Sequence, residues 1–472
     1  MEPATSRPIA PLDSIWLSMD RPNNLMVIVS VILLGEVPDW DAVTEMVRDR
    51  VIDQYPVFRQ RPEPASLPGG RPRWVDDDDF DMERHIRRVT LPAPGDDAAL
   101  QRYMEDHIST PLDPRHPLWE YHLIEGRESG AAIFCRFHHA LADGLALAKV
   151  LLSMTDEPEG TTGPDSASAA PPRTARSGSH HGSPSGLDLV RGALDRAMHL
   201  PTLDGLREAG GLAVDTTKVV SELLLGHNPE NPLTGTPQPS KKVAWSHPLP
   251  LEGPKAVGRL AGATLNDVLL SAVAGALRTY QLERGVEPVD LITMVPVNLR
   301  PLDVPIPSEL GNDFTLIYFK FPSATPTPLG RLAETKRRMD WLKASPETAL
   351  THLLMDVMGR TTPALERLVV DFFANKALGV TTNVIGPRSP RLLAGVPIEG
   401  LLGWVPGSGS HSVGVCIFTY TGTVRVGMIT DATLVPDPQR LVTAFEEELD
   451  VLVSIGTPPA RKRARKRSAS AH

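Results

Sequence analysis

Residues 137–144 read Phe137-His138-His139-Ala140-Leu141-Ala142-Asp143-Gly144 and are the most informative stretch of this 472-residue chain. The residues before them, 133–138, alternate at a period of two, which is typical of a β-strand. The run after them, 144–152, is rich in alanine and leucine, which favours a helix. The two histidines therefore lie where a strand ends, and neighbouring strand side chains point to opposite faces. Only one of the two imidazoles can face a given cleft.

His139 is the candidate general base of this stretch. An unperturbed imidazole has a pKa of about 6.5 and is mostly neutral at pH 7, so it can take a proton from an attacking hydroxyl. His138 is interpreted as a structural imidazole whose side chain points the other way. Asp143 has two compatible interpretations, as the N-cap of the following helix and as a partner for a distant arginine. Gly144 is expected to allow a tight turn where a side chain would clash.

Composition excludes several classes of protein. The formal net charge of −9 argues against a chain that binds nucleic acid over its whole surface. The only cysteines, Cys135 and Cys416, have neither disulfide nor metal-site spacing, so we expect a reducing cytoplasm, no metal and no cofactor. We find no GxSxG, GxGxxG, GxxxxGK[ST] or HExxH motif, which leaves a serine lipase as a weak alternative.

Apolar segments of the chain are too short to cross a membrane. The longest run, 25–34, stops at Gly35, far below the roughly 20 residues of a spanning helix, and is predicted to be a buried strand. The N-terminus lacks the basic and apolar pattern of a signal peptide. Any membrane role is therefore expected to be peripheral. The stretch 461–467 holds six basic residues, and we expect it to be a disordered tail. Three interpretations remain open for it: a solvated tail without a partner, attachment to anionic phospholipid, and binding of nucleic acid.

Two α/β halves are predicted from the order of strands and helices. The N-terminal domain is predicted at residues 1–154, a disordered Ser- and Pro-rich linker at 155–186, and a helical segment with a crossover at 187–240. The C-terminal domain is predicted at 241–458 and the basic tail at 459–472. Asp39 is predicted to cap a helix that ends at Tyr55-Pro56, and Thr264 with Asp267 to form a capping box before a helix to Tyr280. Later strands are predicted at 291–295, 314–321, 379–385, 412–420 and 424–429, and a closing helix from Pro436.

The His-His-x-x-x-Asp-Gly stretch resembles the signature of coenzyme A-dependent acyltransferases related to chloramphenicol acetyltransferase and to peptide-synthetase condensation domains. Further blocks resemble the bacterial wax ester synthase/diacylglycerol acyltransferase family in particular, in the family's order along the chain. They are Pro117-Leu118-Trp119-Glu120, Asn231-Pro232-Leu233, Asn266-Asp267-Val268-Leu269, Pro296-Val297-Asn298-Leu299-Arg300, Gly311-Asn312 and Thr382-Asn383-Val384-Ile385-Gly386-Pro387.

This resemblance implies two chloramphenicol-acetyltransferase-like mixed α/β domains with an active-site tunnel between them. It implies His139 as base, with acyl-CoA as co-substrate and diacylglycerol or a long-chain alcohol as acceptor, at a membrane or lipid-droplet surface and without nucleic acid. Asn266, Asn298 and Arg300 are the candidate substrate-binding residues. Arg300 is also a candidate partner for Asp143.

Some features depart from the family's pattern and leave the substrate open. Asn298 stands where serine is expected, Lys241-Lys242 where arginines are common, and the linker is long. Three alternatives to diacylglycerol acylation remain: wax ester synthesis, acyl transfer on carrier-bound intermediates, and a non-catalytic lipid-droplet binding protein. The intact motif argues against the last of these, and the lack of a carrier-like domain counts against the second.

Overall fold

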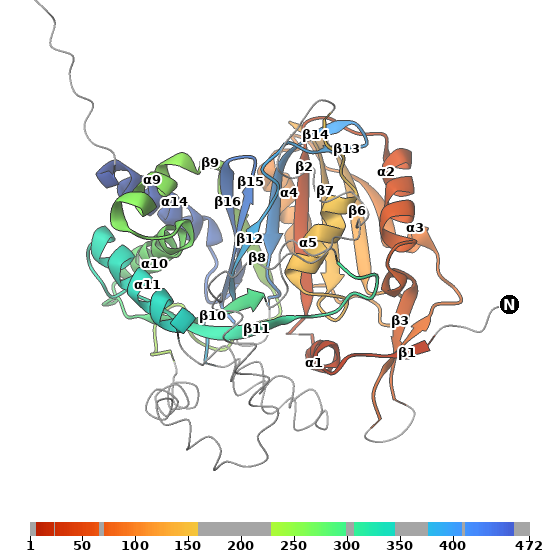
Figure 1. Ribbon diagram of the computed structural model, residues 1–472, viewed down its shortest axis with the longest axis horizontal. Helices are drawn as coiled ribbons and strands as arrows, with labels where there is room; N and C mark the ends of the chain where they lie inside the picture. Colours follow the sequence, from red (N-terminus) through yellow and green to blue (C-terminus); the bar gives the residue numbers. More distant parts are fainter. Residues whose placement is uncertain are drawn as a thin grey trace, which may run out of the picture.

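The computed structural model describes residues 6–22, 24–65, 70–158, 228–298, 306–344, 376–407 and 411–456. These residues form two mixed α/β halves that lie side by side, the N-terminal half in red to yellow and the C-terminal half in green to blue in Figure 1. The predicted fold class is confirmed by the order of elements and by the sheets. The predicted linker beyond residue 158, the helical segment at 187–225 and the basic tail lie outside the described residues.

The N-terminal half is built on a six-stranded sheet. Its strand order is β13 (Leu392–Leu393), β14 (Val396–Trp404), β2 (Val27–Leu34), β7 (Gly130–His138), β6 (Trp119–Arg127) and β5 (Ile86–Thr90). Its helices are α1 (Pro11–Met19), α2 (Trp40–Val47), α3 (Met82–His85), α4 (Asp97–Ile108) and α5 (Gly144–Ser153). A small sheet of β1 (Ser6–Pro8), β4 (Arg73–Asp76) and β3 (Gln60–Glu63) lies beside them.

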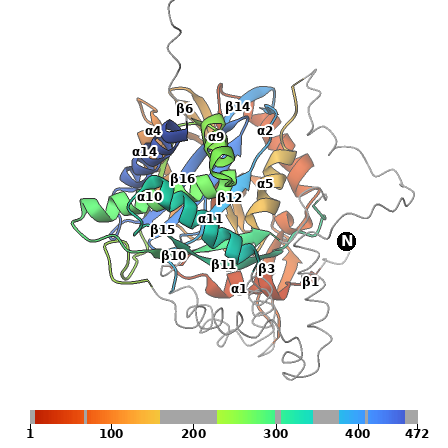
Figure 2. The same cartoon turned by 60° about the vertical axis from the view of Figure 1, so that its left-hand side comes forward.

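The C-terminal half carries a second sheet and a layer of helices on it. The strand order is β12 (Thr381–Ile385), β15 (Val413–Tyr420), β16 (Thr423–Asp431) and β8 (Lys241–Trp245), with β9 (Leu249–Pro250) on β16. The helices are α9 (Glu252–Ala261), α10 (Leu265–Glu283), α11 (Pro328–Ala344) and α14 (Pro438–Gly456), which gather on the left in Figure 1 and come forward in Figure 2. Among the described residues no single helix could span a bilayer, and α9 and α10 reach that length only across a bend of 101°.

Two strand exchanges join the halves. Strand β14 leaves the C-terminal half and pairs antiparallel with β2, as the blue strand beside the red one in Figure 1 shows. The division at residue 241 did not anticipate this exchange. The strand was not predicted because it contains Pro397 and two glycines, Gly400 and Gly403, which are unfavourable inside a strand. The pairing with β2 has a register shift between Ile398 and Gly400.

The second connection is the antiparallel ribbon of β10 (Leu291–Asn298) and β11 (Phe314–Phe321). A bridge between Met294 and Val380 attaches β10 to the C-terminal half. The free end of the ribbon runs along the base of the molecule toward the N-terminal half in Figure 1. Its last pair, Asn298 and Phe314, reaches the end of β7.

Most predicted elements are present, with two corrections in the N-terminal half. The helix capped by Asp39 is not one helix to Tyr55: it is α2 followed by a π-helical turn, Arg48–Ile52. The linker does not begin at residue 155, because Asp156 forms a bridge with Leu392 and an ion pair with Arg50 at 2.8 Å. The capping box at Thr264 is confirmed.

Candidate active site

The two histidines lie where β7 ends. His138 is its last residue, and the backbone N–H of His139 donates to the carbonyl of Met26 at 2.7 Å, so His139 stays attached to the sheet. The loop then runs to Asp143, which caps α5. The imidazole of His139 is therefore carried by a rigid strand end.

The two imidazoles have different surroundings. His138 is 2% exposed, and its Nδ1 accepts a hydrogen bond from the N–H of Ala140 at 3.1 Å. The ring of His139 stacks on Trp16 of α1, with 4.4 Å between ring centroids, and lies 5.5 Å from the ring of Phe314 at the start of β11. His138 is thus bonded into the loop, whereas His139 contacts aromatic side chains from the two halves of the molecule, which also stack on each other.

The ring of His139 offers one nitrogen to a substrate. Its Nδ1 is buried and has no well-aligned hydrogen-bond partner among the described residues, while the side chain as a whole is partly exposed. This leaves Nε2 as the accessible nitrogen. Burial lowers the pKa of His139 to about 4, and its own backbone carbonyl and the charge of Asp143 only partly oppose the shift. The imidazole is therefore neutral at pH 7.

Asp143 fixes two backbone segments at once. Its Oδ1 accepts from the N–H of Ala146 at 2.9 Å, which confirms the N-cap interpretation. Its Oδ2 accepts from the N–H of Asp313 at 3.1 Å, across the junction between the halves. The predicted pairing with Arg300 stays a prediction, because residues 299–305 lie outside the described residues.

The reason predicted for Gly144 is wrong. A Cβ built on Gly144 would meet no atom within 4 Å, and the backbone of this residue is not left-handed. Steric exclusion therefore does not require glycine here. Gly144 is the first residue of α5, directly after its cap.

The remaining predicted residues are brought together only in part. Asn298 pairs in register with Phe314, so it lies next to a residue that contacts His139. Asn266 lies in the first turn of α10, where its Oδ1 accepts from Nδ2 of Asn383 on β12 at 3.0 Å. Two of the family-like blocks thus meet at the edge of the C-terminal sheet.

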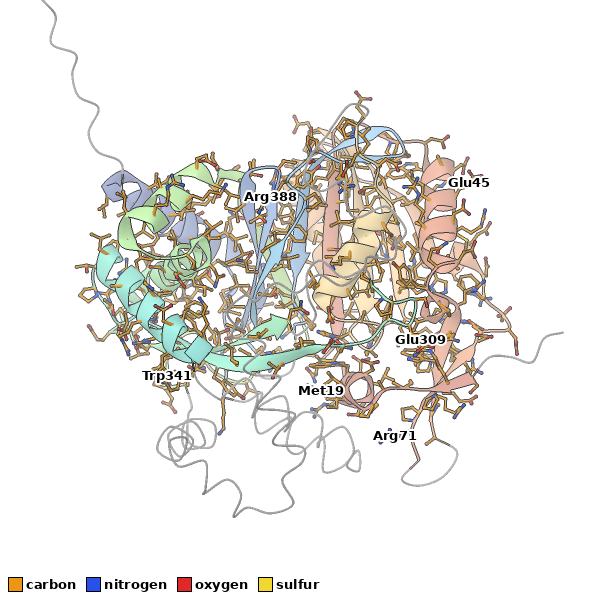
Figure 3. The ribbon with its side chains drawn as sticks, viewed as in Figure 1. Met19, Glu45, Arg71, Glu309, Trp341 and Arg388 are labelled. Carbon is orange, nitrogen blue, oxygen red and sulfur yellow. The ribbon has the colours of Figure 1, made fainter. Side chains whose placement is uncertain are left out.

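Helix α1 supplies site residues that the sequence interpretation missed. Trp16 stacks on His139, and Asp13 binds Asn312 beside the motif loop. Figure 3 labels Met19, the last residue of α1, and Glu309, which lies shortly before Asn312 in the sequence. Asp13 is 2% exposed, and burial raises its pKa to about 6. A buried carboxyl in a nine-residue N-terminal helix has no motif to mark it, although Pro11 at the helix start was a usable signal for the helix itself.

Comparison with known proteins defines the class. Residues 9–269 match the wax ester synthase/diacylglycerol acyltransferase catalytic domain, and residues 310–453 match the C-terminal domain of the same family. The chain belongs to this family and is an acyltransferase.

Individual relatives cover nearly the whole chain. A protein of Mycobacterium tuberculosis named a probable diacylglycerol O-acyltransferase is 28% identical over 96% of both chains. The wax ester synthase/diacylglycerol acyltransferase of Marinobacter aquaeolei VT8 has a similar structure, with a TM-score of 0.66, 22% identity and coverage of 95% of this chain and 99% of that one. The first condensation domain of the CDA synthetase matches with a TM-score of 0.59 and 15% identity over 97% of both chains.

Proposed function

We propose that this acyltransferase moves a long-chain acyl group from acyl-CoA to the hydroxyl of diacylglycerol, with Nε2 of His139 as general base. The observation that carries the proposal is the placement of His139. It is a neutral imidazole with one accessible nitrogen, in contact with Trp16 and Phe314 where the two halves meet. The name of the mycobacterial relative supports diacylglycerol as the acceptor.

The chemistry needs one base and no covalent acyl-enzyme intermediate. Nε2 takes the proton of the acceptor hydroxyl while its oxygen attacks the thioester carbonyl carbon. The tetrahedral intermediate collapses, the carbon–sulfur bond breaks, and the thiolate of coenzyme A takes the proton back from Nε2. Holding the two substrates together removes much of the barrier, and a positioned base contributes a further factor of roughly 10² to 10⁴.

The low pKa of His139 suits this cycle in one respect and opposes it in another. A pKa of about 4 keeps the imidazole in the accepting state at neutral pH. The same burial disfavours the imidazolium that forms after proton transfer. The charge of Asp143 favours that cation, so the carboxylate assists the step without touching the substrate.

The test is an acceptor panel with purified protein. Radiolabelled palmitoyl-CoA is incubated with diolein or with hexadecanol, for the wild type and for His139→Ala. We expect labelled triacylglycerol from the wild type only. Labelled wax ester without triacylglycerol would show that the acceptor is a long-chain alcohol and not diacylglycerol. No ester from any acceptor would favour a non-catalytic lipid-binding protein. His116→Ala is the control, since His116 forms its own pair with Asp77 away from the motif.

We also propose that the enzyme works at a membrane or lipid-droplet surface, to which its C-terminal end attaches it. Two large apolar side chains are exposed near the ends of the adjacent helices α9 and α14, Leu260 at 71% and Ile455 at 49%. The stretch 461–467 with its six basic residues follows α14 in sequence. Apolar side chains and nearby basic residues together favour an anionic lipid surface.

A further inference from the structure

Asn312 connects three parts of the site. Its backbone N–H and its Nδ2 both donate to Oδ1 of Asp13, at 2.9 and 2.8 Å. The same Nδ2 donates to the backbone carbonyl of His139 at 2.8 Å. One side chain from the C-terminal half therefore ties α1 to the loop that carries the candidate base.

Two buried polar atoms at this contact remain unpaired. They are Nδ1 of His139 and Oδ1 of Asn312, and neither has a well-aligned hydrogen-bond partner among the described residues, although the carbonyl of His139 itself also favours a proton on its ring. One atom can donate and the other can only accept, and they belong to residues already in contact. A buried polar group without a partner costs free energy, so pairing these two is favoured. The Asn312 side chain is also among the groups that hold up the pKa of His139.

We propose that Asn312 is a positioning residue whose Oδ1 accepts Nδ1–H of His139, and that Asp13 holds Asn312 in this orientation. A proton fixed on Nδ1 leaves Nε2 as the accepting nitrogen, which is the form that a general base requires. This inference rests on the proposed role of His139. The new element is that Asn312, a residue from the other half of the chain, selects the tautomer of His139.

Asp13 makes the arrangement sensitive to pH. Burial raises its pKa to about 6, against the hydrogen bonds from Asn312 and the charge of Arg7, while Asp143 adds to the rise. Asp143 and His138 are the charged or titratable groups that act on His139. Protonation of Asp13 weakens the acceptor that orients Asn312. The turnover number kcat should therefore fall as pH drops through about 6, well above the pKa of His139 itself.

The first test is the kinetics of Asn312→Ala. We expect kcat to fall about tenfold to a hundredfold, the usual cost of losing a group that orients a functional histidine. KM for palmitoyl-CoA should stay within about threefold, because Asn312 acts through His139. The matched control is Gln281→Ala, which removes another buried amide that fixes a loop, through Leu277 and Val289 of the C-terminal half. That variant should lose melting temperature and keep kcat. A wild-type kcat in Asn312→Ala would overturn the inference.

The second test uses Asp13→Asn, which keeps an acceptor oxygen and removes the titration. We expect a lower kcat at pH 7.5 that no longer falls between pH 7 and pH 5, at an unchanged or higher melting temperature. If Asp13 were purely structural, Asp13→Asn would lower the melting temperature and kcat would still fall between pH 7 and pH 5. That result would overturn the inference. Near-normal turnover in His139→Ala would show that the proposed base is wrong. An inactive His139→Ala beside a fully active Asn312→Ala would contradict the positioning role alone.

Discussion

His139 and His122 belong to neighbouring parts of the same sheet and have opposite environments. The ring of His122 on β6 is 0% exposed and both of its nitrogens are engaged, Nδ1 with the Tyr103 hydroxyl at 2.6 Å and Nε2 with Glu120 at 3.3 Å. Because Glu120 accepts, Nε2 donates, and Nδ1 accepts the hydrogen bond from the Tyr103 hydroxyl. His139 leaves one nitrogen accessible and one buried without a partner.

The difference separates structural from functional imidazoles. Burial lowers the pKa of both rings, so a shifted pKa alone does not distinguish them. What distinguishes them is that both nitrogens of His122 are hydrogen-bonded, whereas Nε2 of His139 is accessible. His122 belongs to a network in which Glu120 also binds Arg136 at 2.6 Å, and neither nitrogen of His122 is left for a substrate.

The largest expected effect is on activity, at His139, whose Nε2 is accessible. His139→Ala should lower kcat at least about a hundredfold with an intact fold, because the general base is lost. His138→Ala should lower it less, or act through stability, since Nδ1 of His138 accepts from the loop backbone. Steady-state acylation of diolein and thermal unfolding measure both. Equal losses of kcat at both positions with unchanged melting temperatures would contradict the distinction.

The next largest effect is expected on stability, at the network of His122, Glu120 and Arg136. Glu120→Gln should lower the free energy of unfolding by about 3 to 5 kcal/mol, because Arg136 stays buried without its charge partner. Urea denaturation measures this loss, with Glu45→Gln as control at an exposed site on α2 labelled in Figure 3. A loss no larger than that of Glu45→Gln would count against a network held by this pair.

The same carboxylate predicts a pH dependence with a definite sign. Burial would raise the pKa of Glu120, but the His122 hydrogen bond and the charges of Arg136 and Arg87 lower it to about 2. A depressed pKa stabilises the fold above the unfolded value near 4.5, and the contribution is lost as pH falls toward 2. The wild type should therefore lose its advantage over Glu120→Gln in that range.

A smaller effect is expected from His122→Gln. The glutamine keeps one donor and one acceptor, so the free energy of unfolding should fall by about 1 to 3 kcal/mol. The kcat of the folded variant should match the wild type. A drop in kcat comparable with that of His139→Ala would mean that the two imidazoles are coupled.

Whether a feature could be predicted from the sequence depends on how far apart in the chain its interacting residues lie. The cap at Asp143 and the capping box at Thr264 were predictable, because both depend on residues three apart. The exchange of β14 and the contact of Asp13 with Asn312 were not, because they join residues hundreds of positions apart. A family resemblance identified the motif but not the helix α1 that packs against it.

The smallest expected effect on turnover is at the C-terminal tail. Truncation after Pro459 should leave activity on detergent-dispersed substrate nearly unchanged, since residues 460–472 follow α14 in the sequence and include no site residue. It should weaken binding to vesicles rich in anionic lipid, because each basic residue near such a surface contributes about 1 kcal/mol. The difference should vanish at high salt. Vesicle flotation with equal, salt-insensitive binding of both proteins would rule out attachment through the tail.

The central claim is that His139 is a neutral imidazole with a free Nε2, and nitrogen-15 NMR of histidine-labelled protein tests it most directly. The resonances of His139 are those lost in His139→Ala. We predict a single neutral tautomer with the proton on Nδ1 between pH 8 and about 7, loss of that single tautomer as Asp13 becomes protonated near pH 6, and a titration midpoint of the ring near pH 4. A ring with its proton on Nε2, or one already half protonated at pH 6.5, would contradict the account.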